Sequence, residues 1–538
     1  MTEFLCIAST RACQGCFLNV FEALLKSQIK GPKEYGPQPE TAWQVQNRVS
    51  FSIFVLALAA SISTWFIALR APLRLDETGS YWQINAGFIE IWPRQFSALS
   101  FPAYSYILWF STKLIGTSEI ALRIPSVIAM LGAVYLLYLA AREMFERDIA
   151  IIAAVVFCLH PIVVFAAIDI RPYAFGALAT NAAILILLRL RHNDSSWLAA
   201  LFGLAAASII WFHYIFGLIL PALALCFIFF KFRDRKTLLR QLGIALGVFA
   251  LALLPAIPGL TDLFSTSRTH VYEVAPDLSE LAWTVAPGFL PFVLFGSVFL
   301  AFLVVAATRQ RFLFNKFEGW RLFVCASLAL IPVLILYGLS VGSSMHMFAP
   351  RHRLEAIPGI ALCWAFVLSR FRSRYLAVFF CVALVGVTAF RSLNAPLARD
   401  HDFSMKYALE AAEKSASADR APIVLCSGFV ESNYSAMPSP ETVKDSLLFA
   451  PITYYKLSGP VVPLPQLLNK QALQISSQFL QQAAQTHQHF LLVADPWFSH
   501  ETLDWFAQNA AASHTVHKLG MFQGTEVLEF VPRTDPAH

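Results

Sequence analysis

The sequence predicts a polytopic α-helical membrane protein that ends in a small α/β domain outside the membrane. Of the 538 residues, 57% are hydrophobic and only 14% are charged, whereas ordinary soluble domains carry about 25% charged residues. The apolar residues gather in runs long enough to cross a bilayer, which takes about 20 residues. After residue 391 the chain becomes polar, and short strand-like runs alternate with helix-like stretches.

Residues 1–50 are the first predicted region, a cytoplasmic N-terminal extension. They hold one short apolar run, from about Phe17 to Leu25, and then a polar stretch that contains prolines. A secretory signal peptide combines a basic start, an apolar core and a small-residue cleavage site, and no such combination is convincing here. We therefore expect this region to stay on the cytoplasmic side.

Residues 51–391 predict a transmembrane domain of about 11 to 13 spanning helices with additional outer juxtamembrane helices. The stretch Phe101–Ile115 is short, contains Pro102 and carries Lys113. We interpret it as a helix that lies in or dips into the outer interface, with a short span as the alternative. The runs that predict spans are Phe51–Leu69, 121–141, 149–167, 172–190, 197–212, 214–230, 238–257, 288–307, 320–341, 354–369 and 375–391.

The basic residues of the loops predict the orientation. With residues 101–115 not counted as a crossing, one side of the membrane receives sixteen Lys and Arg residues and the other side receives five. Basic residues are enriched in cytoplasmic loops, so the first side is cytoplasmic. This bias also accounts for the net charge of +6 without a nucleic-acid partner. The acidic residues near positions 76 and 169, and everything after residue 391, then face the outer side.

Residues 392–538 predict a small extracytoplasmic α/β domain. Helix-like stretches cover about 402–417 and 499–511. The region has no glycine-rich phosphate loop and no nucleophile elbow, so we assign it no chemistry. The strand-like runs are Pro422–Cys426, Phe490–Ala494 and Glu526–Val531.

Three acidic residues on the predicted outer side are the candidate catalytic groups. Asp76 and Glu77 follow the first span, and Asp169 lies in the turn between two later spans. Carboxylates can act as a general base toward a hydroxyl or amine, or hold a divalent cation. If a metal is present, these three residues are the predicted ligands. The simpler alternative is a solvated loop at residues 76–77 and a local Asp169–Arg171 pair that neutralises itself.

Basic and aromatic residues on the same side predict a binding site for an anionic donor. Arg171, Arg351 and Arg353 offer forked donors for a phosphate group, and we place Lys113 at the lipid-facing edge. The aromatic and histidine residues predicted to line a sugar- or lipid-facing pocket also fit the ordinary interfacial aromatic belt. They are Tyr81, Trp82, Tyr104, Tyr173, His213 and Tyr214, of which Tyr173 is also placed with the donor-binding residues.

The order of these motifs resembles a known family. It runs from Asp76-Glu77 through the string Gly-Thr-Ser-Glu-Ile-Ala-Leu-Arg-Ile-Pro-Ser at 116–126, Arg171-Pro172-Tyr173 and His213-Tyr214 to Pro350-Arg351-His352-Arg353-Leu354. The chain is similar to the GT-C superfamily of polyprenyl-phosphate-sugar glycosyltransferases. It most resembles the bacterial branch related to protein O-mannosyltransferases and lipid A aminoarabinose transferases.

The resemblance implies a catalytic acid at Asp76 with Glu77 beside it, and a second acidic position at Asp169. It also implies a bacterial inner-membrane location, with the active site on the outer side. Relatives usually carry a basic residue before a Pro-Pro pair, where this chain reads Ser100-Phe101-Pro102. Arg171, Arg351, Arg353 or Lys113 then has to contact the carrier phosphate. Relatives also tend to have Arg-Tyr where this chain has Arg351-His352.

The resulting hypothesis is a membrane glycosyltransferase. It moves a sugar from a polyprenyl-phosphate-linked donor to a lipid, glycan or protein acceptor, with membrane lipids as further partners and a divalent metal ion as the one cofactor considered. The alternatives are a flippase or transporter for lipid-linked glycans and a glycan polymerase or ligase. A flippase is expected to carry charged groups along a path through the bilayer. Here the ionisable residues gather at one face, which favours the enzyme.

Overall fold

The computed structural model describes much of the chain, and residues 51–538 form one compact unit. The described residues are 42–97, 101–266, 275–285, 319–343, 346–369, 378–379, 381–386, 404–417, 419–429, 446–496 and 499–533. The boundary predicted between residues 391 and 392 lies outside them, as does nearly all of the predicted N-terminal extension.

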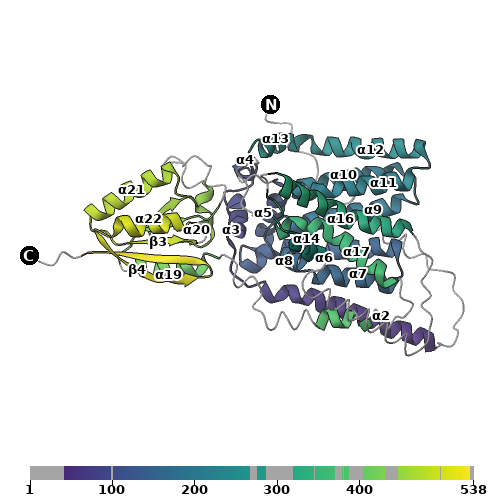
Figure 1. Ribbon diagram of the computed structural model, residues 1–538, viewed down its shortest axis with the longest axis horizontal. Coiled ribbons are helices and arrows are strands. Elements are labelled where there is room, and N and C mark those ends of the chain that lie inside the picture. Colours follow the sequence, from purple (N-terminus) through teal and green to yellow (C-terminus); the bar gives the residue numbers. More distant parts are fainter. Residues whose placement is uncertain are drawn as a thin grey trace, which may run out of the picture. The chain divides into compact units, whose positions relative to one another are not determined.

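The first part of the chain is helical (Figure 1). Its helices are α2 (Ala42–Ser63), η1 (Thr64–Ala68), α3 (Leu75–Asn85), α4 (Ile91–Ser97), α5 (Ala103–Ile115), α6 (Glu119–Met144), α7 (Arg147–Leu159), α8 (Pro161–Ala167), α9 (Tyr173–Leu190), α10 (Ser196–Phe212), η2 (Tyr214–Ile219), α11 (Leu220–Lys231), α12 (Arg235–Leu253), η3 (Leu254–Ala256), α13 (Ile257–Thr266), α14 (Leu278–Val285), α16 (Gly319–Gly342), η5 (Pro350–Ala356) and α17 (Ile357–Ser369).

Six helical segments of the described chain are long and apolar enough to cross a membrane. The pair α7 and α8 adds a seventh if it is one broken span, bent by 72°. The bend lies at His160, which caps α8 by accepting a hydrogen bond from Ile162 N, and Pro161 begins the new helix. The six segments are Phe51–Ala68, Glu119–Met144, Tyr173–Leu190, Tyr214–Lys231, Arg235–Thr261 and Gly319–Gly342.

The predicted class of multi-span helical membrane protein is confirmed, but the predicted 11 to 13 spans exceed what the described residues show. The predicted spans 197–212 and 354–369 are the shorter helices α10 and α17, of 17 and 13 residues. The predicted span 288–307 lies outside the described residues, as does part of 375–391. The described residues therefore bear on part of the predicted count, and in that part the apolar run at 354–369 forms a helix, α17, that is shorter than the roughly 20 residues a span needs.

Helix α5 corresponds to the stretch predicted to lie at the interface. It has 13 residues, too few to cross a bilayer. It ends at Gly116, whose φ of +86° is a conformation that glycine adopts without strain. Ser118 then caps α6 by accepting a hydrogen bond from Ala121 N. This short connection separates α5 from the long span α6.

Two glycines allow close approach of helix backbones in the membrane part. A Cβ atom at Gly203 of α10 would lie 2.2 Å from Ala245 O of α12, and one at Gly359 of α17 would lie 2.4 Å from Ala329 N of α16. Small residues at helix contacts are typical of membrane proteins, because they let backbones pack closely where burial alone gives little driving force.

The C-terminal region is a mixed five-stranded sheet in the order β2-β1-β3-β5-β4, which confirms the predicted α/β character. Strand β1 pairs in parallel with β2 and β3, whereas β5 pairs antiparallel with β3 and β4. Strands β2 and β4 were not predicted. The elements are α19 (Lys406–Ala416), β1 (Ile423–Cys426), η9 (Leu447–Phe449), α20 (Ala450–Tyr454), β2 (Val461–Leu464), α21 (Lys470–Gln485), β3 (Phe490–Ala494), α22 (His500–Ala510), β4 (His514–Phe522) and β5 (Thr525–Pro532).

Helices cover both faces of this sheet (Figure 1). One core joins Val424 and Leu492 to residues of α21 and α22, and the other joins Leu425 and Leu491 to residues of α19. Successive strand residues point to opposite faces. Strands β1 and β3 are therefore apolar throughout and buried on both sides.

Candidate active site

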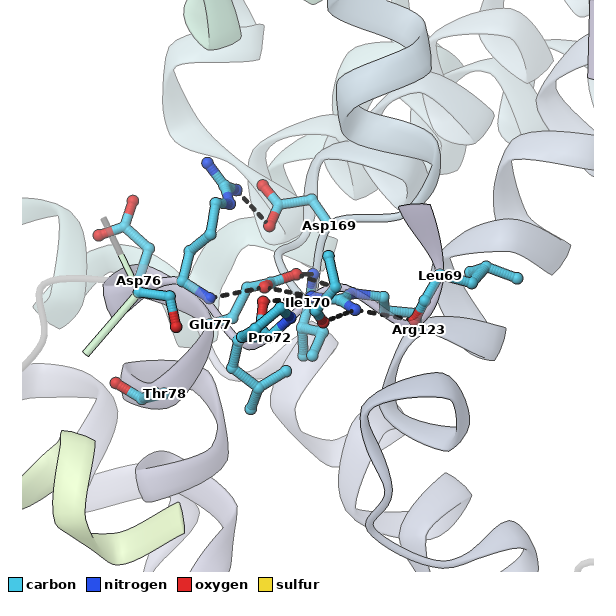
Figure 2. Close-up of polar contacts among 12 residues, drawn as sticks. Leu69, Pro72, Asp76, Glu77, Thr78, Arg123, Asp169 and Ile170 are labelled. Carbon is cyan, nitrogen blue, oxygen red and sulfur yellow. Dashed lines mark hydrogen bonds and ion pairs between the residues drawn. The ribbon is translucent and has the colours of Figure 1, made fainter. Parts of the chain in front are cut away.

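Glu77, in the first turn of α3, is buried and connects this helix to neighbouring segments. Its side chain has no exposed surface, and Oε2 lies 2.7 Å from Nη2 of Arg123 in α6. Oε1 accepts hydrogen bonds from Arg123 Nε at 3.3 Å and from Ile170 N at 3.1 Å. Oε2 also accepts from Arg74 N at 2.9 Å, which caps the start of α3. Both carboxylate oxygens are therefore occupied by neighbouring donors (Figure 2).

Arg123 connects this carboxylate to the chain segment that precedes α3. It donates hydrogen bonds to the carbonyl oxygens of Leu69, Ala71 and Pro72 at 2.8, 2.5 and 3.1 Å. Its guanidinium is fully buried. Buried charges are tolerated when they are paired and hydrogen-bonded, and both conditions are met here. The pair fixes how the chain passes from the first span into α3.

Asp169 forms a second buried ion pair next to the first. Its Oδ1 lies 2.6 Å from Nη2 of Arg74, and the Asp169 side chain has no exposed surface. The Arg74 guanidinium stacks over the Phe165 ring at 4.1 Å. Ser126 of α6 donates to the Asp169 carbonyl oxygen at 2.6 Å. The partner of Asp169 is thus Arg74 rather than Arg171, the residue considered from the sequence.

Asp76 differs from the other two acids because its side chain is 37% exposed. It points away from Glu77 and Arg123 in Figure 2. Its Oδ2 lies 3.9 Å from Nη1 of Arg351. Burial raises the pKa of Asp76, but the positive charges of Arg171, Arg351 and Arg74 outweigh it and hold the pKa below its ordinary value. Asp76 is therefore an ionised, accessible carboxylate at neutral pH.

A group of aromatic and imidazole rings around His213 lies near Arg171 and Arg351. His213 packs against Tyr173, Tyr214 and His352 with ring centroids 5.3, 5.5 and 5.6 Å apart. His352 Nδ1 donates to the Met347 carbonyl oxygen at 2.8 Å. Burial, together with the nearby arginines, lowers the pKa of His352 to about 3 and the pKa of His213 well below its ordinary value. Both imidazoles are neutral at pH 7 and can offer hydrogen bonds without adding charge.

Arg353 and Lys113 make contacts of a different kind. Arg353 donates to the Glu280 carbonyl oxygen at 3.0 Å and to Thr284 Oγ1 at 2.6 Å, which ties η5 to α14. The Lys113 ammonium stands 5.1 Å from the centre of the Trp109 ring near the end of α5. No contact found among the described residues joins Lys113 to Asp76, Asp169 or Arg351.

The two remaining pocket tyrosines have different surroundings. Tyr104 is 2% exposed, and its ring centre lies 5.7 Å from that of Phe175. Burial raises the pKa of Tyr104 well above its ordinary value, so its hydroxyl stays protonated. Tyr81 meets Tyr454 of the C-terminal region edge-on, with ring centres 5.1 Å apart.

Sequence reasoning missed two arginines of the site. Arg123 stands inside the motif at 116–126 and Arg74 lies two residues before Asp76, but neither was given a function. The signal was available for Arg123, because an arginine in an otherwise apolar span is costly without a partner. As for the predicted metal ligands, no group of three or more His, Cys, Asp or Glu side chains in the described part of the chain is arranged to hold a metal ion. Glu77 and Asp169 instead pair with arginines.

The comparisons with known proteins agree with this fold. Residues 100–261 match the family model of dolichyl-phosphate-mannose-protein mannosyltransferases. The crystal structure of ArnT from Cupriavidus metallidurans bound to undecaprenyl phosphate is 13% identical, covering 88% of this chain and 97% of that chain with a TM-score of 0.51. The apo structure of the same ArnT is 14% identical over the same shares, with a TM-score of 0.50. No curated protein matched the sequence.

The helical membrane fold, the small α/β region and the family match together define a membrane glycosyltransferase of the GT-C type. The resemblance predicted from the order of the motifs is thereby confirmed.

Proposed function

We propose that this glycosyltransferase moves a sugar from a polyprenyl-phosphate-linked donor to a lipid, glycan or protein acceptor on the outer side of a bacterial inner membrane, with Asp76 as the general base. The observation that carries the proposal is the environment of Asp76, an exposed and ionised carboxylate facing Arg351 and Arg171. The ArnT structure that shares the fold was solved with undecaprenyl phosphate, which supports a lipid-phosphate donor.

The proposed reaction is a displacement at the anomeric carbon of the sugar. The Asp76 carboxylate takes the proton of the acceptor hydroxyl or amine while the acceptor atom bonds to that carbon. The bond from this carbon to the phosphate oxygen breaks, and its electron pair leaves with the phosphate. The departing phosphate gains negative charge, which Arg171 and Arg351 stabilise as forked cations beside Asp76. Neutral His213 and His352 complete the donor pocket with hydrogen-bonding groups.

The buried acids have a different purpose in this proposal. Glu77 and Asp169 are themselves fully buried and each pairs with an arginine, so they position the loops that carry Asp76 and Arg171 and do not exchange protons. This revises the interpretation from the sequence, in which all three acids were candidate catalytic groups. Arg171 and Arg351 also replace Lys113 and Arg353 as the proposed phosphate-binding residues.

The test uses the full-length protein, purified and placed in liposomes without an ion gradient. The donors are synthetic undecaprenyl-phosphate-linked sugars, and the measured product is released undecaprenyl phosphate in the presence of envelope extract. Asp76→Asn should lower turnover about 10²- to 10⁴-fold, because an amide cannot accept the proton. Asp504→Asn, an exposed change in α22, is the matched control and should keep wild-type turnover.

Wild-type turnover by Asp76→Asn would overturn the assignment of the base. Movement of intact donor across the bilayer with no released undecaprenyl phosphate would favour a flippase instead. A glycan polymerase or ligase uses the same chemistry, and fractionation of the extract into lipid, glycan and protein acceptors separates it from the other transferases.

A further inference from the structure

Two adjacent tyrosines of the C-terminal region contact loops of the membrane part. Tyr455 Oη accepts a hydrogen bond from Leu73 N at 2.6 Å. Tyr454 Oη donates to the Thr117 carbonyl oxygen at 3.1 Å. The two tyrosine rings meet edge-on with centres 4.9 Å apart. Tyr455 thus contacts the segment just before α3, and Tyr454 contacts the loop just before α6.

The end of strand β1 contacts the same helix. Gly428 follows β1 with a φ of +74°, and a Cβ atom there would lie 2.8 Å from Leu75 Cδ2. Phe429 packs so closely on α3 that a Cβ at Gly79 would lie 3.1 Å from its ring. In α/β sheets the carboxyl ends of parallel strands are the usual place for ligands. Here the carboxyl end of β1 is in contact with α3, which carries Asp76.

The segment from Leu69 to Leu73 is therefore held from two sides. Arg123 binds the carbonyl oxygens of Leu69, Ala71 and Pro72 from within the membrane part. From the C-terminal region, Tyr455 Oη accepts a hydrogen bond from the backbone N–H of Leu73, the residue that follows Pro72. Leu73 is fully buried, so its N–H has no water to replace a lost partner. Asp76 follows three residues later.

We propose that Tyr455 is a positioning residue for catalysis, through which the C-terminal domain fixes the loop that aims Asp76 at its substrates. This rests on the proposed function, in which Asp76 is the general base. The domain to which the sequence assigned no chemistry is then part of the active-site structure. A general base has to lie within hydrogen-bonding reach of the proton it removes, and a misplacement of about 1 Å can cost about 100-fold in rate.

The experiment compares Tyr455→Phe with wild type in the full-length protein. The change removes the acceptor for Leu73 N and keeps the ring. Turnover should fall about 10- to 100-fold with the KM for the donor within about twofold. The acid limb of the pH–rate profile should move to higher pH, because a loosened Asp76 lies less firmly among its arginines. Tyr407→Phe, at a 41% exposed tyrosine in α19, is the matched control and should change neither the turnover nor the acid limb.

Hydrogen exchange supplies a readout that does not depend on activity. Tyr455→Phe should speed amide exchange in residues 69–75 and leave exchange in β1 and β3 unchanged. Exchange that rises equally throughout the C-terminal sheet would show general unfolding and overturn the proposal. If Asp76→Asn is inactive but Tyr455→Phe keeps wild-type turnover and acid limb, the inference fails and the proposed function stands. If both variants are fully active, the proposed function fails and the inference with it.

Discussion

The acidic residues around α3 fall into two groups with opposite environments, although Asp76 and Glu77 are adjacent in the sequence. The side chains of Glu77 and Asp169 have no exposed surface and pair with Arg123 and Arg74, whereas the side chain of Asp76 is 37% exposed and lies 3.9 Å from Arg351. Successive helix residues are rotated by about 100°, so one acid of the pair turns into the protein and the next turns toward solvent. The buried pairs fix the structure, and the open carboxylate remains available for proton transfer.

Glu77→Gln should have the largest effect on stability. It removes the charge that compensates Arg123, and an uncompensated buried charge costs about 3–5 kcal/mol. We expect a lower unfolding midpoint and a fall in activity that follows the loss of folded protein. Thermal unfolding in detergent, with Asp76→Asn as the comparison, measures the difference. Equal stabilities of the two variants would remove the distinction between the buried and the open acids.

Arg351→Gln should have a smaller effect, concentrated in catalysis. The substitution removes the hydrogen bond that Arg351 is proposed to donate to the departing phosphate. A hydrogen bond to a charged group contributes about 1.5–3 kcal/mol, so turnover should fall about 10- to 150-fold. Arg351 is one of the cations that lower the pKa of Asp76. The proposed reaction needs ionised Asp76, so wild-type activity should persist as the pH falls to the ordinary pKa range of an aspartate and should decline only below that range. In Arg351→Gln this decline should begin at higher pH, and an unshifted acid limb would contradict the contact.

Lys113→Ala should have the smallest effect. Its ammonium lies against Trp109 at the end of α5, outside the cluster around Asp76. We expect turnover and donor KM within about twofold of wild type, since exposed charges contribute about 0–1 kcal/mol. A large rise in the KM for the undecaprenyl-phosphate sugar would show that Lys113 binds the donor after all, and would restore the prediction made from the sequence.

Much of the candidate site could be predicted from the sequence because its residues carry charge where charge is costly. Asp76, Asp169, Arg171 and Arg351 stand next to apolar runs, and ionisable residues in such places are functional candidates by default. The same reasoning could not tell that Arg353 donates to residues of α14, because a buried arginine can equally serve to hold a neighbouring helix. Nor could hydropathy alone tell that the run at 354–369 forms a helix as short as α17, because length is decided by where the helix begins and ends.

By itself, the sequence determined the class of protein, the small α/β region and the order of the charged motifs, because composition and hydrophobic runs are local properties of the chain. Only the tertiary structure decided which acid is exposed, because Glu77 is buried against Arg123, which lies 46 residues further along the chain. The contact between Leu73 and Tyr455 likewise joins residues that are 382 positions apart. No local pattern encodes such contacts, since they form only when packing brings distant helices and the C-terminal domain to one place.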